Sequence, residues 1–303
     1  MADRPLVWIP RPVHDDALAR LRPHAEVCPG YGPEGVTFDQ VGDRVTAILL
    51  RTERVDGAMM RRAPRLRVVA RHGVGLDTVD LDTARELGIT VTTTPTANSR
   101  SVAEHAVALL LAVRRGIGIA VRDEGDTRAA IQGRELGGAT LGLVGFGRIA
   151  RELAAIAGQG FGMRVLAHDP MVPGSVMTDA GVEPVDLPTL LSLSENLSLH
   201  VPLVEETRHL IGLPELLALP EGAVVVNTSR GGILDESALL TAVRQGHLAG
   251  AGLDVTAVEP LPSDHPLRGE PSVVITPHTG AQTAQALRRM ATEAADHIIA
   301  HIT

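Results

Sequence analysis

Three residues of this chain carry the side chains needed for proton transfer on a small acid: Arg230, Glu259 and His278. Each follows a short apolar run that predicts a β-strand. Ligands of open α/β sheets bind beyond the carboxyl ends of the strands, which is where these residues fall. An imidazole can exchange a proton with a hydroxyl, a carboxylate can fix the tautomer of that imidazole, and a guanidinium can hold a carboxylate through two donors. The three types predict a site that interconverts a 2-hydroxy acid and a 2-keto acid by hydride transfer.

A candidate cofactor site precedes these residues. The run 140–144 predicts a buried strand that leads into Gly145, Gly147 and Ala150 and then into a helical apolar pattern. Gly145 permits a tight turn, Gly147 lets the backbone approach a pyrophosphate, and Ala150 occupies the position where the helix packs on the strand. The start of the helix offers free N–H groups to an anion. This strand, turn and helix therefore predict a dinucleotide-binding unit.

The residue that selects the dinucleotide is expected at the end of the next strand. The apolar run 163–168 ends at Asp169, which lies 22 residues after Gly147. A carboxylate there accepts hydrogen bonds from both ribose hydroxyls and repels a 2′-phosphate, and no arginine follows at once. The sequence favours NAD over NADP.

The chain contains no lysine, so all 28 residues counted as Lys+Arg are arginines. This excludes a P-loop, a Schiff-base enzyme and the Tyr and Lys pair of the short-chain dehydrogenases, because each requires a lysine amine. The only tyrosine, Tyr31, lies in a loop rich in proline and glycine. Histidine is the remaining candidate for proton transfer beside a nicotinamide.

Composition indicates a globular protein of two domains. The chain has 303 residues, 44% of them hydrophobic, and a formal charge of −8. An acidic balance argues against nucleic acid as a partner. The single cysteine, Cys28, allows no internal disulfide, the first residues up to Arg4 lack the apolar core of a signal peptide, and no apolar run approaches the ~20 residues of a membrane span. We expect a cytoplasmic protein with no membrane association.

Short strands alternate with helices along the chain, which predicts an α/β fold with parallel sheets. The predicted strands cover residues 6–9, 46–50, 66–70, 90–92, 140–144, 164–168, 197–200, 224–227, 251–254 and 273–275. Predicted helices cover 82–87, 101–113, 187–193, 236–245 and 284–300. Ser101 and Glu104 are spaced as a capping box for the second of these. The last helix has no strand after it, so we expect it to fold back on the first domain.

The chain resembles the D-isomer-specific 2-hydroxyacid dehydrogenases over essentially its whole length. The motifs that carry the resemblance are Gly145-Phe146-Gly147-Arg148-Ile149, His200-Val201-Pro202-Leu203, Asn227-Thr228-Ser229-Arg230-Gly231-Gly232, Gly252-Leu253-Asp254-Val255, Glu259-Pro260 and Thr276-Pro277-His278-Thr279-Gly280. The resemblance implies two domains of Rossmann-like or flavodoxin-like type. The NAD-binding domain, residues 99–280, is expected to be inserted into a substrate domain of residues 1–98 and 281–303.

The resemblance also implies roles for individual residues. Arg230, Glu259 and His278 are expected to be catalytic. The expected NAD pocket, with Thr228 and Asp254 on its nicotinamide side, consists of Gly145, Phe146, Gly147, Arg148, Ile149, Asp169, His200, Val201, Pro202, Thr207, Thr228, Ser229, Asp254 and Gly280. Residues 71–80 look like the family's carboxylate-binding loop, in which the N–H groups of Val74 and Gly75 hold the substrate.

Within the family, residues 50–52 and 98–104 look most like those of D-3-phosphoglycerate dehydrogenases, where an arginine at the position of Arg51 binds the anionic substrate. Asn98 is expected either to contact the substrate or to act as a loop and capping residue. His72 and Thr78 depart from the common pattern, which has Ala and Asn there. The substrate therefore stays open, with 3-phosphoglycerate first and glyoxylate, hydroxypyruvate, lactate-type or other phospho- or sulfo-substituted acids as alternatives.

Two further arginines have open roles. Arg71 and Arg100 could contact substrate, pair with acids or face solvent.

No metal site is expected. His297 and His301 are four residues apart on the last helix, but no acid or cysteine completes a set of ligands. At 303 residues the chain leaves no room for a regulatory C-terminal domain, and we expect no feedback control by serine. Hinges are expected near Asn98 and Gly280.

The resemblance implies a homodimer formed largely through the cofactor domains, with the helix from Ser101 at the interface. It also leaves open a function of another class. The chain could be an NADH-sensing binding protein on the same scaffold, like the family's transcriptional corepressors.

Overall fold

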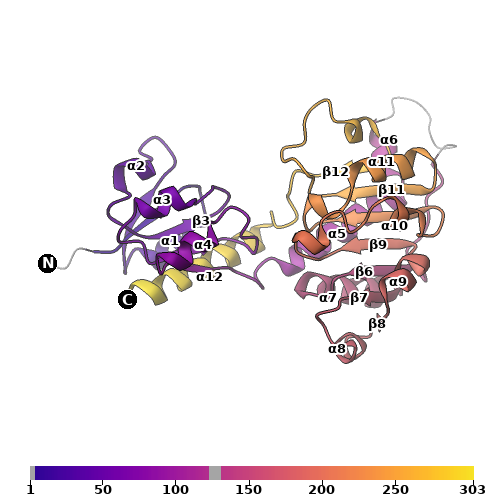
Figure 1. The fold of residues 1–303 in the computed structure, drawn as a ribbon, viewed down its shortest axis with the longest axis horizontal. Coiled ribbons are helices and arrows are strands. Elements are labelled where there is room, and N and C mark those ends of the chain that lie inside the picture. The colour runs from indigo at the N-terminus through magenta and orange to yellow at the C-terminus, as the bar shows by residue number, and fades with distance from the viewer. Residues whose placement is uncertain (1–3, 123–130) are drawn as a thin grey trace. The chain divides into compact units, whose positions relative to one another are not determined.

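The computed structural model describes residues 4–122 and 131–303. Residues 1–3, on which the expected lack of a signal peptide partly rests, lie outside the described residues. The chain divides into two compact units: unit 1 comprises Met1–Asn98 and Gln282–Thr303, and unit 2 comprises Ser99–Ala281 (Figure 1). No helix in the described part of the chain is long and apolar enough to cross a membrane.

Unit 1 is a parallel five-stranded sheet in the order β2-β1-β3-β4-β5. The strands are β1 (Leu6–Ile9), β2 (Glu26–Pro29), β3 (Val45–Leu50), β4 (Val68–Arg71) and β5 (Thr90–Thr92). The helices are α1 (Asp15–Leu21), α2 (Phe38–Val41), α3 (Gly57–Arg61), α4 (Leu81–Glu86) and α12 (Ala284–Ile302). β1 and β3 are buried along their whole length, as expected for strands covered on both faces.

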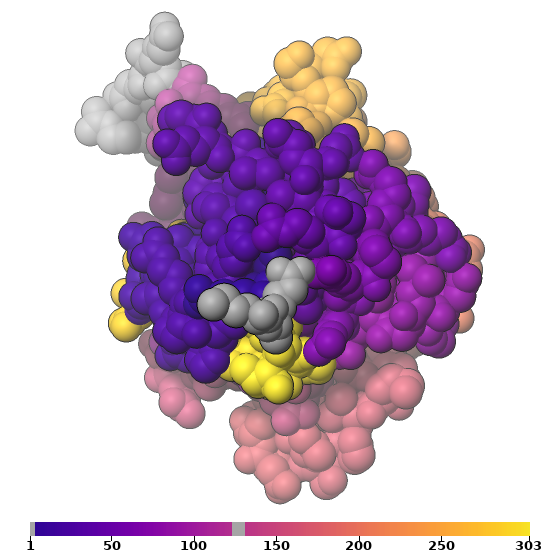
Figure 2. Space-filling view, turned by 90° about the vertical axis from the view of Figure 1, so that its left-hand side faces the viewer, coloured from indigo at the N-terminus to yellow at the C-terminus, as the bar shows by residue number. Residues whose placement is uncertain are grey.

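The two faces of this sheet pack into separate cores because successive side chains of a strand point in opposite directions. Ile48 and Leu50 of β3 contact one cluster, with Phe38 and Met60, while Leu49 belongs to the other. The second cluster includes the buried alanines and isoleucines of α12, which packs against α1, β3 and β4. In Figure 2 the end of α12 (yellow) reaches the surface of unit 1 among its early segments. The C-terminal helix therefore completes unit 1, and unit 2 is inserted into it.

Unit 2 is a parallel seven-stranded sheet in the order β12-β11-β10-β9-β6-β7-β8. The strands are β6 (Thr140–Val144), β7 (Arg164–His168), β8 (Glu183–Pro184), β9 (Asn196–Leu199), β10 (Ala223–Asn227), β11 (Leu248–Leu253) and β12 (Val273–Ile275). The α-helices are α5 (Ser99–Arg114), α6 (Ile117–Arg122), α7 (Arg148–Ala155), α8 (Gly174–Asp179), α9 (Leu187–Leu193), α10 (Leu213–Leu217) and α11 (Glu236–Arg244). Short helical turns are η1 (Ile156–Gly160), η2 (Glu205–Thr207), η3 (Gly231–Ile233) and η4 (Pro266–Gly269).

The strand order of unit 2 reverses at β6. From β6 the chain proceeds through β7 and β8 toward one edge, and it returns to pair β9 on the other side of β6 before adding β10, β11 and β12. This is the order of the doubly wound dinucleotide-binding fold, in which ligands bind at the carboxyl ends of the strands on either side of the reversal. The end of β6 and the end of β9 are therefore the place to examine for a cofactor.

The predicted α/β fold with two parallel sheets is confirmed, and all ten predicted strands occur with ends displaced by at most three residues. The structure adds β2 and β8, which the sequence did not predict. The predicted capping box is wrong. Helix α5 begins at Ser99, so Ser101 lies inside its first turn, and Glu104 accepts a hydrogen bond of 2.7 Å from Arg100. The charge pair at i,i+4 takes the carboxylate that a capping box needs.

Candidate active site

The loop after β10 holds Arg230 through a buried asparagine. Asn227 is 1% exposed, and its Oδ1 accepts hydrogen bonds from the N–H of Ser229 at 3.0 Å and from the Ser229 hydroxyl at 2.9 Å. Its Nδ2 donates to the carbonyl oxygen of Arg230 at 2.9 Å, and Nη1 of Arg230 donates to the carbonyl of Ser229 at 2.7 Å. A single side chain thus fixes the turn from which the guanidinium projects.

Gly231 brings this loop against the loop after β11. A Cβ at position 231 would lie 2.0 Å from the carbonyl carbon of Thr256 and 2.3 Å from the nitrogen of Ala257, so the two backbones are in direct contact. Glu236, at the start of α11, accepts a hydrogen bond of 2.6 Å from the N–H of Ala257. The loop that carries Arg230 and the loop that carries Glu259 are therefore built as one block.

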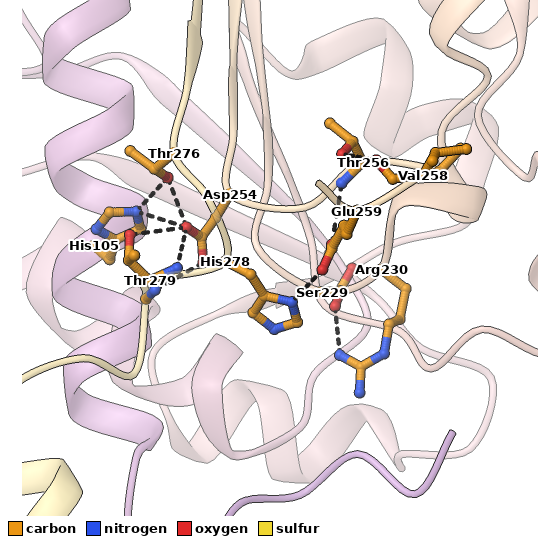
Figure 3. Close-up of polar contacts among 12 residues, drawn as sticks. His105, Ser229, Arg230, Asp254, Thr256, Val258, Glu259, Thr276, His278 and Thr279 are labelled. Atoms are coloured by element: carbon orange, nitrogen blue, oxygen red, sulfur yellow. Dashed lines mark hydrogen bonds and ion pairs between the residues drawn. The ribbon is translucent and has the colours of Figure 1, made fainter. Parts of the chain in front are cut away.

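Glu259 and His278 form a hydrogen-bonded pair. Nδ1 of His278 lies 2.8 Å from Oε2 of Glu259, and Oε1 of Glu259 accepts a hydrogen bond of 3.3 Å from the N–H of Thr256. A carboxylate can only accept, so Nδ1 carries the hydrogen and Nε2 keeps a lone pair for a proton. Figure 3 shows this ring between Glu259 and Asp254, with the guanidinium of Arg230 beside the same loops. An acceptor nitrogen next to an anion-binding guanidinium is suited to proton transfer on a carboxylic acid substrate.

Asp254 holds the loop that carries His278. It is 2% exposed, and its carboxylate accepts hydrogen bonds from the Thr276 hydroxyl at 2.6 Å and from the N–H groups of Thr279 and Gly280 at 2.7 and 2.8 Å. Burial by itself raises the pKa of Asp254, but these hydrogen bonds and one from His105 outweigh it, so the pKa lies below its usual value. Asp254 is a buried carboxylate that stays ionised and organises residues 276–280.

The turn after β6 has the conformation that the sequence predicts for a dinucleotide site. Gly145 has φ +90°, and a Cβ there would lie 2.8 Å from the carbonyl oxygen of His200. Gly147 is exposed, caps α7 without a side-chain hydrogen bond, and has no atom within 4 Å of the place that a Cβ would take. Arg148 and Ile149 form the first turn of α7, and Phe146 is fully buried beneath it. The start of α7 thus offers uncapped N–H groups in open space, as a pyrophosphate requires.

Asp169 follows β7 and lies directly beside this turn. Its Oδ2 accepts a hydrogen bond of 2.8 Å from the N–H of Phe146, and its Oδ1 accepts one of 2.9 Å from Met171. The glycine turn and the acidic residue, 23 positions apart, are therefore joined by a hydrogen bond. This places a carboxylate where a ribose diol of NAD binds in the doubly wound fold.

The loop after β9 forms the other side of the strand reversal. His200 contacts Ser198 through Nε2 at 2.8 Å, and burial lowers its pKa to about 4, so its ring is neutral at pH 7. Val201 packs against the core, and Thr207 closes the loop by donating to the carbonyl of Pro202 at 2.6 Å. With Gly145 against His200, this loop and the glycine turn face one another at the strand ends.

Residues of the loops after β10 and β12 also fit a bound dinucleotide. Thr228 is 7% exposed, and its Oγ1 is buried with no hydrogen-bond partner among the described residues. Ser229 is half-buried on the same turn, and Gly280 lies against Asp254. A buried hydroxyl without a partner is costly unless a ligand completes it. Together with the open start of α7 and with Asp169 beside it, this hydroxyl makes the residues present fit NAD.

The expected substrate residues Arg51, Val74, Gly75 and Asn98 belong to unit 1. Val74 is exposed, and the carbonyl of Gly75 accepts a hydrogen bond of 3.0 Å from Nε of Arg71. Arg51 donates to the carbonyl of Pro12 at 3.0 Å and to Oε1 of Gln282 at 3.1 Å. The side chain of Asn98 is buried, and its Oδ1 has no hydrogen-bond partner among the described residues.

Two arginines whose roles were open now have partners. Arg71 also donates to the carbonyl of His72 at 2.6 Å, so it folds onto its own loop and braces it. Arg100 pairs with Glu104 at 2.7 Å and with Glu152 at 3.5 Å on the surface of unit 2. Over residues 4–122 and 131–303 no group of three metal-ligating side chains could hold a metal ion.

Sequence patterns did not identify two of the residues that hold the site together. Glu236 and His105 have no local signal, because their partners lie 21 and 149 or more positions away. The doubled glycine after Arg230 could have indicated a close backbone approach.

Comparison with known proteins finds relatives along nearly the whole chain. Residues 107–280 match the model of the family described as D-isomer specific 2-hydroxyacid dehydrogenase, NAD binding domain. A D-3-phosphoglycerate dehydrogenase of Mycobacterium leprae is 40% identical over 98% of this chain, and the chain spans 56% of the length of that relative. A glyoxylate reductase of Korarchaeum cryptofilum is 38% identical over 98% of this chain and 92% of its own length. The crystal structure of the TT0316 protein from Thermus thermophilus is similar with a TM-score of 0.85 and 38% identity, covering 97% of this chain and 96% of the other.

Proposed function

The chain belongs to the D-isomer-specific 2-hydroxyacid dehydrogenases, and on this premise we propose that it is an NAD-dependent oxidoreductase acting on a D-2-hydroxy acid or its 2-keto acid. NAD, when bound, accepts or supplies the hydride. The observation that carries the proposal is the 2.8 Å hydrogen bond between Glu259 and His278, which lies in the unit that matches the NAD-binding family.

In this proposal His278 moves the proton. Glu259 accepts the hydrogen of Nδ1, which leaves Nε2 to take the hydroxyl proton of the substrate during oxidation and to return it to the carbonyl oxygen during reduction. Arg230 holds the substrate carboxylate and the oxygen that changes between hydroxyl and carbonyl, because a guanidinium presents two parallel donors. Asn227 and Gly231 keep the loop of Arg230 in place.

We propose 3-phosphoglycerate as the first candidate substrate, with glyoxylate and hydroxypyruvate as alternatives. Arg51 supports the phosphorylated acid, because a second anionic group needs a second cation apart from Arg230. The relative from Mycobacterium leprae is named for 3-phosphoglycerate and the one from Korarchaeum cryptofilum for glyoxylate.

The same proposal includes a cytoplasmic homodimer assembled through unit 2. Helix α5 already buries its apolar face inside unit 2, whereas α6 buries none of its residues. Ile117 and Val121, one turn apart on α6, are 49% and 80% exposed. A second copy of the chain that covered this pair would remove their apolar area from water. We therefore propose that the interface includes α6, next to the helix α5 that is expected there.

The experiment that tests the function follows NADH absorbance with glyoxylate, hydroxypyruvate, pyruvate and 3-phosphohydroxypyruvate. We expect turnover with at least one acid, and we expect His278→Ala to reduce kcat by about 10²–10⁴-fold while NADH binding is retained. The matched control is His301→Ala, an exposed histidine at the end of α12, which leaves kcat unchanged. NADH binding by the wild type without turnover of any acid would refute the enzyme and favour the corepressor-like binding protein.

A further inference from the structure

His105 is a half-buried histidine of unit 2 to which the proposed reaction gives no role. It lies on α5, its side chain is 21% exposed, and its Nε2 is 2.9 Å from the Thr276 hydroxyl and 3.2 Å from Oδ1 of Asp254. The Thr276 hydroxyl donates its hydrogen to Asp254, so its oxygen can only accept from His105. Nε2 of His105 therefore carries a hydrogen and donates toward both Thr276 and Asp254 (Figure 3).

The partner of His105 is the residue that organises the loop of His278. Besides the carboxylate contacts to Thr276, Thr279 and Gly280, the carbonyl oxygen of Asp254 accepts a hydrogen bond of 2.8 Å from the N–H of His278. The loop is thus hydrogen-bonded to one buried aspartate at Thr276, His278, Thr279 and Gly280. A change in the orientation of this carboxylate therefore acts on the hydroxyl of Thr276 before His278 and on the backbone of Thr279 and Gly280 after it.

The backbone of His278 needs such a constraint. Its φ is +55°, in the left-handed region that residues other than glycine rarely adopt. A conformation of this kind persists only where the surrounding contacts determine it. Because the direction of a side chain depends on the backbone angles of its residue, a relaxed loop would turn the imidazole away from Glu259.

The same network joins the two ends of unit 2. The chain enters unit 2 at Ser99, at the start of α5, and leaves it after Ala281. A Cβ at Gly280 would lie 2.9 Å from Oδ2 of Asp254 and 3.6 Å from Cδ2 of His105, so the last residues of the unit pack on its first helix. From that helix, the side chain of His105 hydrogen-bonds to the loop.

We infer that His105 is a positioning residue: it donates to Asp254 and Thr276, and through them it keeps residues 278–280 in the conformation that directs the imidazole of His278 toward Glu259. The effect of His105 on catalysis rests on the proposed function. The effect of His105 on the loop rests on the contacts within unit 2 alone. It assigns no proton transfer to His105. Its chemistry is that of a fixed N–H donor.

The test compares two variants of His105. His105→Leu removes the donor at similar volume, and His105→Gln supplies an amide N–H₂ at nearly the same distance from the backbone. The control is His247→Leu, another half-buried histidine of unit 2, whose ring nitrogen Nε2 lies 3.1 Å from the carbonyl oxygen of Leu219. Melting temperatures of all variants establish that each protein is folded.

The first measurement is amide hydrogen exchange in the protein without cofactor. We expect His105→Leu to speed the exchange of Thr279 and Gly280 by about tenfold, because a hydrogen bond that restrains their acceptor is lost. His105→Gln and His247→Leu should keep the wild-type rates. Unchanged exchange in His105→Leu, or equal acceleration in His105→Gln, would overturn the inference.

The second measurement is steady-state turnover of the best 2-keto acid. We expect kcat to fall by about tenfold in His105→Leu, with KM for NADH within twofold of wild type, and to recover in His105→Gln. A kcat that is unchanged while exchange is accelerated would show that the loop does not orient the catalytic ring and would overturn the inference. If the wild type has no activity but exchange changes as expected, the proposed function fails while the effect of His105 on the loop holds.

Discussion

Arg51 carries its positive charge beside a histidine that stays neutral. Burial, and after it the charge of Arg51, lower the pKa of His72 to about 4. His72 is 5% exposed and its Nε2 lies 3.2 Å from the carbonyl of Leu287, so its ring joins the loop of residues 72–75 to α12. The departure from the common alanine thus has a structural consequence inside unit 1, and Arg51, not His72, carries a positive charge at neutral pH.

Arg51→Ala should separate phosphorylated from plain substrates. We expect kcat/KM for 3-phosphohydroxypyruvate to fall by about 10–100-fold more than kcat/KM for pyruvate, because a hydrogen bond between ionised groups contributes about 1.5–3 kcal/mol. Steady-state kinetics with both acids measure this difference. Arg54→Ala, an exposed arginine three residues along the loop, is the control. Equal losses for the two acids would mean that Arg51 does not recognise the phosphate.

At the scale of elements, the site depends on two loops that touch through their backbones. The turn after β10 and the turn after β11 meet at Gly231, where no side chain has room. Glu236 then attaches the start of α11 to the second loop through Ala257. The spacing between Arg230 and Glu259 is therefore set by backbone contact and not by the side chains themselves.

Gly231→Ala should disturb this spacing, because a Cβ 2.0 Å from a backbone carbon cannot be accommodated unless one loop moves. We expect a loss of stability of about 1–3 kcal/mol, measured by denaturant unfolding, and a fall in kcat of at least about tenfold. In Gly232→Ala the nearest atoms belong to the flexible side chain of Leu203, at 3.2 Å, so both quantities should stay near wild type. If the two variants behave alike, the backbone contact does not set the geometry of the site.

At the scale of the whole molecule, α6 of unit 2 is a candidate for the surface through which two copies of the chain associate. Helix α6 exposes Ile117 and Val121, and it borders a cavity of about 370 Å³ lined by apolar residues such as Ile119 and Ile131 and by the polar residues Arg114, Gln132 and Arg134. The exposed side chains of α6 project from the surface, and the cavity beside them could receive side chains of a second copy. A surface of this kind is suited to the self-complementary contact of a twofold dimer.

Ile117→Glu combined with Val121→Glu should convert the proposed dimer into a monomer, because two charges would have to be buried in an apolar interface. Sedimentation at micromolar concentration measures the assembly. The control, Leu217→Glu, changes a comparably exposed leucine on α10 and should remain dimeric. A monomeric wild type, or a double variant that still dimerises, would contradict the assignment of α6.

The sequence by itself determined the features that depend on neighbours along the chain. The glycine turn at 145–147, the buried strands and the acid after β7 are local patterns, and the fold class follows from their alternation. It missed β2 and β8, which lie at the edges of their sheets, are short and end in proline, so neither shows a run of buried apolar residues. The capping box failed because the helix begins at Ser99, two residues before the predicted cap, and Glu104 pairs with Arg100.

Only the tertiary structure decided how the site residues are held. The sequence could place Glu259 and His278 at neighbouring strand ends, but their hydrogen bond requires the left-handed backbone at 278, which Asp254 and His105 stabilise from positions 24 and 173 residues earlier in the chain. Gly231 is likewise required only because the backbone of Thr256, from another loop, lies against it. Contacts between segments so far apart leave no periodic pattern, because they depend on packing in three dimensions and not on the local conformation of either segment.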